Sequence, residues 1–168
     1  MKASSALTRA AILLAIGIWL PTVFHMVGQG GAIWLPMHWS ILLGGYYLPI
    51  GYAVLLGFLT PALSALITGM PPAPLHYFIM LELGALGGTI AWLRRKNPEA
   101  IYGPLLAGML ASRVFRLVGS LAGVMFFSLP LSMKDVMFSV FVLALPGIAL
   151  QWLLLPLLVR RLRQHRLD

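Results

Sequence analysis

Cysteine is absent from the 168 residues of this chain, and only 4 residues are acidic. Without cysteine there are no disulfides, no thiolate chemistry and no cysteine-ligated metal. Four acidic residues are too few for a catalytic carboxylate pair or a magnesium site, and the chain has no GxxxxGKS/T phosphate loop, no HExxH helix and no GxSxG turn. We therefore expect a protein that is not an enzyme and that carries no cofactor.

Charge is scarce, since 10% of the residues are charged, 60% are apolar and the mean hydropathy is +0.93. Soluble domains carry about 25% charged residues, so an ordinary soluble domain is excluded. The segment 36–72 carries no charge at all, and a soluble fold could not hide so long an apolar run. The composition predicts one all-α integral membrane domain over residues 1–168.

The basic residues, which give the chain a net charge of +8, flank apolar segments instead of forming a surface stripe. They lie at Lys2 and Arg9, at residues 94–96 and in the tail at residues 160–166. Clusters of this kind are typical of the cytoplasmic side of a membrane protein. The lipid bilayer, and not a nucleic acid, is the expected partner.

Six apolar segments are predicted to be helices. They cover residues 6–24, 36–48, 52–68, 75–93, 101–127 and 136–159. A bilayer core of ~30 Å needs ~20 helical residues, so the second segment, which would span ~20 Å, is short. A glycine-rich loop at 25–35 breaks the helix between the first two segments, and Pro146 and Pro156 are expected to kink the last one.

The distribution of lysine and arginine sets the topology. With six spans and both termini cytoplasmic, 9 of the 12 basic residues lie inside, Lys134 lies outside, and Arg113 and Arg116 lie within the fifth span. Counting residues 36–70 as one span would place a basic cluster outside. The alternative interpretation of the first helix as a cleaved signal peptide, cut near Gly30 and Ala32, would spoil this topology.

Arg113 and Arg116 are the strongest functional signal, because a charge at mid-membrane costs about 2.5–3.5 kcal/mol even on a mild scale. Their spacing puts both on one helix face. Glu82 is the only acidic residue within a predicted span. Counted at the helical rise per residue, the depth below the outer end of the helix is ~10 Å for Glu82, ~15 Å for Arg116 and ~20 Å for Arg113. A pair between Glu82 and Arg116 is therefore feasible.

Two interpretations of this charge cluster remain open. In the first, Glu82 and one arginine form a structural clamp between the fourth and fifth helices. In the second, one carboxylate cannot neutralise two guanidiniums, and the remaining positive charge binds a carboxylate or phosphate of a substrate. The second interpretation predicts a cavity that opens outward and has a net positive floor.

Two histidines, His25 and His38, each lie beside a methionine near the first loop, which would suit copper or nickel. Packing is the favoured interpretation, because no His-x-His or carboxylate pattern accompanies them, and no metal is predicted. Trp34 and Trp39 suit either an interfacial belt or a lid stacked over a ligand.

Small residues on the first helix form two overlapping steps, one from Ala6 to Ala10 and one from Ala11 to Ala15. Such steps allow another helix to approach closely, either a partner's helix or one of the same chain.

The order of these features resembles a known family. The run PMHWSILLGGYYLPIGYAVLLGFLTPALSALITGMPP contains a short helix, a PxG turn, a second helix and a GMPP exit, and LELGALGGTIAWLRR follows it. With the glycine-rich loop and the small-residue steps on the first helix, this arrangement is similar to the substrate-binding S component of energy-coupling factor (ECF) vitamin transporters. The resemblance spans most of the chain.

The resemblance implies a six-helix subunit, in the plasma membrane of a prokaryote, that captures a vitamin or related micronutrient for ATP-driven uptake. It also implies two kinds of partner, a transmembrane coupling subunit and a pair of ATPases. The alanines expected to contact the coupling subunit match Ala11 and Ala15, with Ala6 and Ala10 as a displaced alternative.

The resemblance further assigns binding residues to the first loop, which acts as a lid, and to the outer halves of the last three helices. In this chain they are Gln29, Trp34, His38, Glu82, Arg113, Arg116 and Gln151. Nickel and cobalt members share an N-terminal Met-His, whereas Met1 is followed here by Lys2, which disfavours a metal substrate. No motif in the chain is specific for riboflavin, thiamine, folate or biotin.

Two other functions are considered. The alternative function is a membrane scaffold or assembly factor with a structural Glu-Arg clamp. A small membrane enzyme is the third possibility, but the sequence contains no set of catalytic residues for it.

Overall fold

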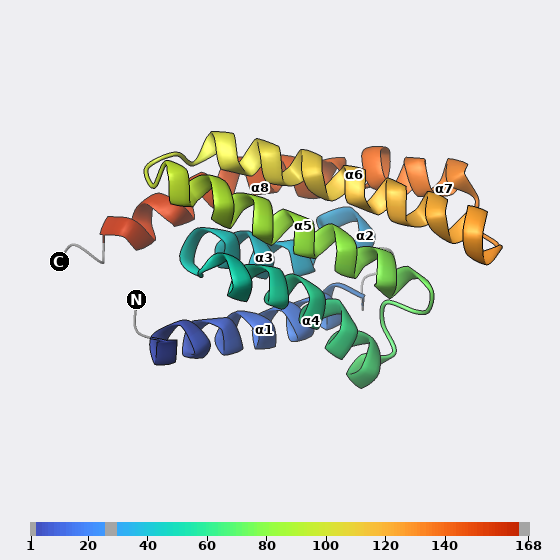
Figure 1. The fold of residues 1–168 in the computed structure, drawn as a ribbon, viewed down its shortest axis with the longest axis horizontal. Coiled ribbons are helices and arrows are strands. Elements are labelled where there is room, and N and C mark those ends of the chain that lie inside the picture. The colour runs from blue at the N-terminus through green and yellow to red at the C-terminus, as the bar shows by residue number, and fades with distance from the viewer. Residues whose placement is uncertain (1–2, 26–29, 165–168) are drawn as a thin grey trace.

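The computed structural model describes residues 3–25 and 30–164, and within those residues the chain is helical without a strand. Figure 1 shows the helices packed side by side in an elongated bundle. The elements are α1 Ala3–His25, α2 Gly30–Trp34, α3 Pro36–Tyr47, α4 Ile50–Thr68, α5 Leu75–Lys96, α6 Tyr102–Phe127, α7 Met133–Met137, the π-helix η1 Phe138–Leu143 and α8 Leu145–Gln164.

Five of the six predicted spans are long and apolar enough to cross a bilayer. They are α1, α4, α5, α6 and the run Met133–Gln164 that joins α7, η1 and α8. Helices suit this environment because every backbone polar group is satisfied within the segment. The sixth, α3, has 12 residues, or ~18 Å at the helical rise, which is shorter than a bilayer core.

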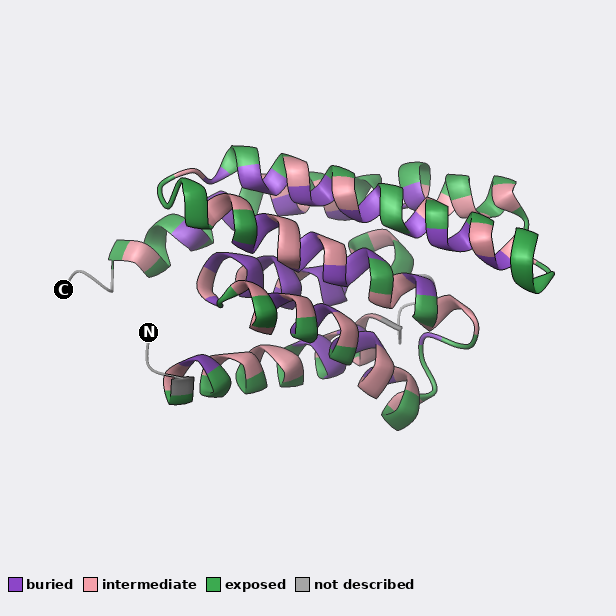
Figure 2. Cartoon of the chain, viewed as in Figure 1, coloured by how far each residue is buried: buried purple, intermediate pink, exposed green. Residues whose placement is uncertain are grey.

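The short helix α3 lies inside the bundle. Nine of its 12 residues are buried, and Ile41 and Leu42 are fully buried among side chains from α5, α6 and α8. Figure 2 shows the buried faces of the surrounding helices turned toward α3 and α5. A helix enclosed by other helices does not have to span the bilayer, so the short length predicted for this segment is compatible with the fold.

The start of α1, the α3–α4 turn, the α5–α6 connection and the end of α8 all lie at one end of the bundle (Figure 1). The arginines of α5 and α8 therefore gather at that end, which we call the basic end. Arg163 of α8 contacts Glu99 of the α5–α6 connection at 3.2 Å there. This gathering agrees with the charge distribution from which the topology was predicted.

Glycines let α4 and α5 approach each other closely. A Cβ atom added to Gly57 of α4 would lie 2.5 Å from the Gly84 nitrogen of α5, and one added to Gly87 of α5 would lie 2.7 Å from the Ala53 oxygen of α4. Small residues at such crossings bring two backbones into van der Waals contact. This contact fixes α5, the helix that carries Glu82.

We expect Gly57→Ala to destabilise the protein by about 1–3 kcal/mol, because the added methyl group has to push α4 and α5 apart. The measurement is thermal unfolding in detergent. Gly103→Ala in α6 is the matched control, since its added Cβ would meet no atom within 4 Å. Equal melting temperatures for the two variants would show that the α4–α5 contact is not tight.

Three details of the predicted helices were wrong. The glycines at 30 and 31 do not break the chain into an irregular loop but lie in α2, where a Cβ on Gly30 would overlap the Phe24 carbonyl oxygen. The fourth predicted helix continues through the basic cluster to Lys96. The last one begins at Met133, passes through a π-helix and restarts at Leu145, so Pro146 falls in a first helical turn, which tolerates proline.

Candidate functional site

A cavity of about 270 Å³ lies between α1, α2, α3, α5, α6 and η1, and the α4–α5 connection also borders it. Its polar wall consists of His38, Glu82, Arg113, Arg116 and Ser139. Its apolar wall includes Pro21, Leu35, Met37, Pro71, Pro72, Ile79 and Val140. The cavity therefore combines a small charged wall with an apolar lining, as ligand sites commonly do.

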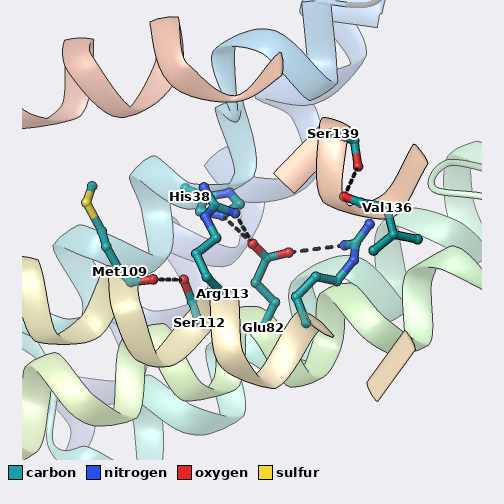
Figure 3. Close-up of polar contacts among 8 residues, drawn as sticks. His38, Glu82, Met109, Ser112, Arg113, Val136 and Ser139 are labelled. Carbon is teal, nitrogen blue, oxygen red and sulfur yellow. Dashed lines mark hydrogen bonds and ion pairs between the residues drawn. The ribbon is translucent and has the colours of Figure 1, made fainter. Parts of the chain in front are cut away.

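Glu82 is the centre of the charged wall. Its Oε1 accepts a hydrogen bond from Nη1 of Arg113 and lies 3.4 Å from Nε2 of His38, while its Oε2 accepts one from Nη1 of Arg116 at 3.1 Å. Figure 3 shows His38 and Arg113 converging on one oxygen of Glu82. All four side chains are buried, with Glu82 only 3% exposed.

Three helices bring these side chains together. Arg113 and Arg116 are three residues apart on α6 and share a face, and α6 packs along α5, which carries Glu82. His38 comes from the first turn of α3, which packs on the same helix α5. The predicted pair between Glu82 and Arg116 is present, and the same carboxylate also binds Arg113, because each of its two oxygens takes one arginine.

The cluster holds more positive than negative charge. One carboxylate faces two guanidiniums, and the other described acidic side chains lie elsewhere, Glu99 at the basic end and Asp135 in α7. The Nε atom of Arg116 is buried and has no hydrogen-bond partner within the described residues. An unsatisfied buried donor costs about 1–3 kcal/mol, so a bound acceptor at this position is favourable.

The structure does not bring every predicted binding residue to the cavity. Trp34 is partly exposed and Trp39 packs against the core, and neither lines the cavity. Gln151 is 1% exposed with its Nε2 unpartnered among the described residues, and it lies one helical turn from Gly147, where α8 meets the backbone of α2. Gln29 and the side chain of His25 lie outside the described residues.

Sequence reasoning missed part of the cavity wall. Ser139 and Val140 come from η1, where the hydroxyl of Ser139 donates to the Val136 carbonyl at 2.9 Å. No motif marks them. Pro71 and Pro72, which end the uncharged segment 36–72, also line the cavity, and the proline-marked ends of that segment were the signal in the sequence for its outer rim.

No group of three or more histidine, aspartate or glutamate side chains that could hold a metal occurs in residues 3–25 and 30–164. His38, which was considered as a metal ligand, instead lies against Glu82. The two oxygens of Glu82 accept hydrogen bonds from Arg113 and Arg116 of the same chain.

The two small-residue steps of α1 face different ways. Ala6 is 2% exposed and Ala10 is half-buried against the core, whereas Ala11 and Ala15 are exposed. The first step serves packing within the chain, and the second leaves a flat strip open on the outside of α1.

Comparison with known proteins agrees with this architecture. The model of the family "ECF transporter, substrate-specific component" matches residues 5–159, nearly the whole chain. No curated protein and no solved structure shows a significant match. A helical membrane fold, a buried charged cavity and a family match of this extent lead to one conclusion: the chain belongs to the family of substrate-specific components of ECF transporters.

Proposed function

We propose that this membrane substrate-binding subunit captures a vitamin or related micronutrient that carries a carboxylate or a phosphate, for ATP-driven uptake. The surplus positive charge beside Glu82 supports the proposal. The single observation that carries it is that Nε of Arg116, which lines the cavity, has no hydrogen-bond partner among the described residues. A guanidinium is shaped to bind a carboxylate or phosphate through parallel hydrogen bonds. The apolar wall would hold the remainder of the molecule.

The size of the cavity limits the substrate. Ligand pockets commonly measure about 300–1,000 Å³, and this one, at about 270 Å³, lies just below that range. A single-ring micronutrient or one with a short chain suits this volume, while a large conjugated cofactor does not.

The cavity is assigned to the outer face of the membrane. It is bordered by the α4–α5 connection, at the end of the bundle opposite the basic end (Figure 1). Because basic clusters mark the cytoplasmic side, the cavity opens outward. Gly31, Ala32 and Leu35 from α2 and its C-terminal junction line the cavity, which supports the proposal that α2 acts as a lid.

A thermal-shift panel tests this function. The purified protein is melted with each of a set of vitamins at saturating concentration, and a ligand that binds only the folded state stabilises it by RT ln(1 + [L]/Kd). We expect a shift from at least one carboxylate- or phosphate-bearing compound. If only neutral or cationic compounds shift the melting temperature, the anionic-substrate proposal is wrong.

Ala11 and Ala15 are proposed to contact the transmembrane coupling subunit, which acts with two ATPases. Both alanines are exposed, and α1 is the least buried of the five candidate spans. Small side chains in such a strip allow a partner helix to approach closely, whereas lipid requires no such gap. Ala6 and Ala10 are turned inward and are left out of this interface.

Replacing Ala15 with tryptophan is expected to abolish co-purification with the coupling module while leaving the melting temperature of the isolated subunit unchanged, because the bulky ring projects away from the core. Leu110→Trp is the matched control, at an exposed site on α6, which lies across the bundle from α1 (Figure 1). If the Ala15 variant still forms the full complex, the exposed face of α1 that carries Ala15 is not part of the interface.

A scaffold or assembly factor remains the second candidate. The observation in its favour is that both carboxylate oxygens of Glu82 are already engaged, as a purely structural clamp requires. The two functions differ in whether Arg116 contributes to binding beyond its contribution to stability.

A further inference from the structure

A second cavity, of about 540 Å³, lies at the basic end of the bundle. The α3–α4 turn and the start of α4 form one wall, with Leu48, Pro49, Ile50 and Gly51. The end of α5 and the residues after it form the other wall, with Ala91, Arg94, Arg95 and Pro98. It shares no lining residue with the cavity around Glu82.

The chemistry of this cavity is divided between its two walls. Leu48, Pro49 and Ile50 supply an apolar surface, while Arg94, half-buried, and Arg95, exposed, supply positive charge. Glu99, the acidic residue of the α5–α6 connection, pairs with Arg163 at 3.2 Å. No described acidic side chain lies within ion-pair distance of Arg95. The cavity therefore suits a ligand with an anionic group next to an apolar part.

The cavity lies where two candidate membrane spans end. It is bordered by the first residues of the α4 span and the last residues of the α5 span. One turn from Arg95 on α5, the ring of Trp92 is exposed, and the Nζ of Lys96 lies 3.9 Å from its centroid. Exposed tryptophan beside lysine is typical of the interface between a membrane and water.

We propose that this cavity binds the headgroup of an anionic phospholipid. Arg94 and Arg95 would contact the phosphate, and the apolar wall from Leu48 to Ile50 would contact the glycerol and the first methylenes of the acyl chains. Basic pockets between membrane helices on the cytoplasmic side commonly hold anionic headgroups. This site is independent of the proposed substrate and of its cavity.

Gly51 allows a test that does not change the charge. Gly51 lines the cavity, and a Cβ added there would meet no atom within 4 Å, so a side chain can be added at this position without displacing a neighbouring atom at its base. Gly51→Phe should therefore block the cavity, and the double variant Arg94→Gln with Arg95→Gln should remove its charge. Lys134→Gln, outside this cavity, is the charge-loss control.

The experiment is native mass spectrometry of the purified protein mixed with equal amounts of phosphatidylglycerol and phosphatidylcholine of the same acyl length. We expect the wild type and Lys134→Gln to retain phosphatidylglycerol severalfold over phosphatidylcholine, and both cavity variants to lose this preference. A preference that survives in Gly51→Phe overturns the proposal, as it would reflect diffuse surface charge. A melting curve without added lipid checks that each variant is folded, and Arg95→Gln alone, at an exposed position, serves if another variant does not fold.

Two further arms identify the source of the anionic group. Glycerol 3-phosphate added in large excess should not displace phosphatidylglycerol from the wild type, because it lacks the acyl chains that meet the apolar wall. Complete displacement would mean that a soluble phosphate compound is the ligand and would overturn the assignment to a lipid. Loss of the coupling module in Gly51→Phe with lipid retention unchanged would assign the cavity to a protein partner instead.

Discussion

Replacing Glu82 with alanine is expected to lower the free energy of unfolding by about 3–5 kcal/mol, the cost of breaking a buried ion pair by removing one partner. The variant leaves the guanidiniums of Arg113 and Arg116 buried without a counter-charge, and His38 loses its contact as well. Water cannot compensate easily, since both arginines are less than a tenth exposed.

Thermal or SDS-induced unfolding of the purified protein measures this loss. Glu99→Ala is the matched control, because Glu99 also pairs with an arginine but is exposed, and exposed pairs are worth about 0–1 kcal/mol. A Glu82 variant no less stable than the Glu99 variant would mean that the arginines find other partners and that the cluster is not electrostatically coupled.

A charge-neutral version of the cluster separates stability from function. Combining Glu82→Gln with Arg113→Met and Arg116→Met removes the carboxylate and both guanidiniums together, and replacing a complete buried ion cluster is often neutral for stability. We expect this triple variant to recover most of the stability that Glu82→Ala loses. The triple variant should therefore fold stably but should no longer bind an anionic substrate.

Arg116→Gln is expected to weaken binding of an anionic substrate by about 10- to 150-fold, since a hydrogen bond to a charged group is worth about 1.5–3 kcal/mol. The substitution removes the side chain whose Nε lacks a partner in the described part of the chain, while Glu82 keeps its contacts with Arg113 and His38. The fold should therefore survive, and the loss should fall mainly on affinity.

Titration calorimetry with the strongest compound from the vitamin panel measures that affinity. Arg113→Gln is the comparison, because the Arg113 guanidinium meets the Glu82 oxygen that His38 also approaches, and no atom of Arg113 is buried without a partner in the part of the chain that the structure describes. We expect the Arg113 variant to lose less affinity than the Arg116 variant. Unchanged affinity in Arg116→Gln would leave the scaffold interpretation as the better one.

The sequence was sufficient for five of the six predicted spans and for the charged pair. Apolar length alone identified five helices, and the cost of placing Arg113 and Arg116 in a bilayer pointed to Glu82 as their partner. His38 was assigned to the lid by resemblance, but its contact with Glu82 was not predicted, because that contact depends on where α3 begins relative to α5.

The remaining details depend on tertiary packing that no local pattern encodes. Gly30 and Gly31 read as helix breakers, yet they lie in α2, and at Gly30 the close approach of the Phe24 carbonyl leaves no room for a Cβ atom. Ser139 lines the cavity from within the π-helix η1, a rare type of turn that no pattern in the sequence predicted. The inward and outward small-residue steps of α1 were equivalent in sequence and differ only in which face meets the core.

The most direct test of an anion-binding cavity measures whether the negative charge of the substrate is recognised by Arg116. The strongest carboxylate of the panel is titrated beside its uncharged amide, or the strongest phosphate ester beside its parent alcohol, into the wild type and into Arg116→Gln. A bound anion at the unpartnered Nε predicts that the wild type prefers the charged compound by at least ~10-fold and that the variant loses most of this preference. Equal affinity of the wild type for both compounds, or the same preference in the variant, would contradict it.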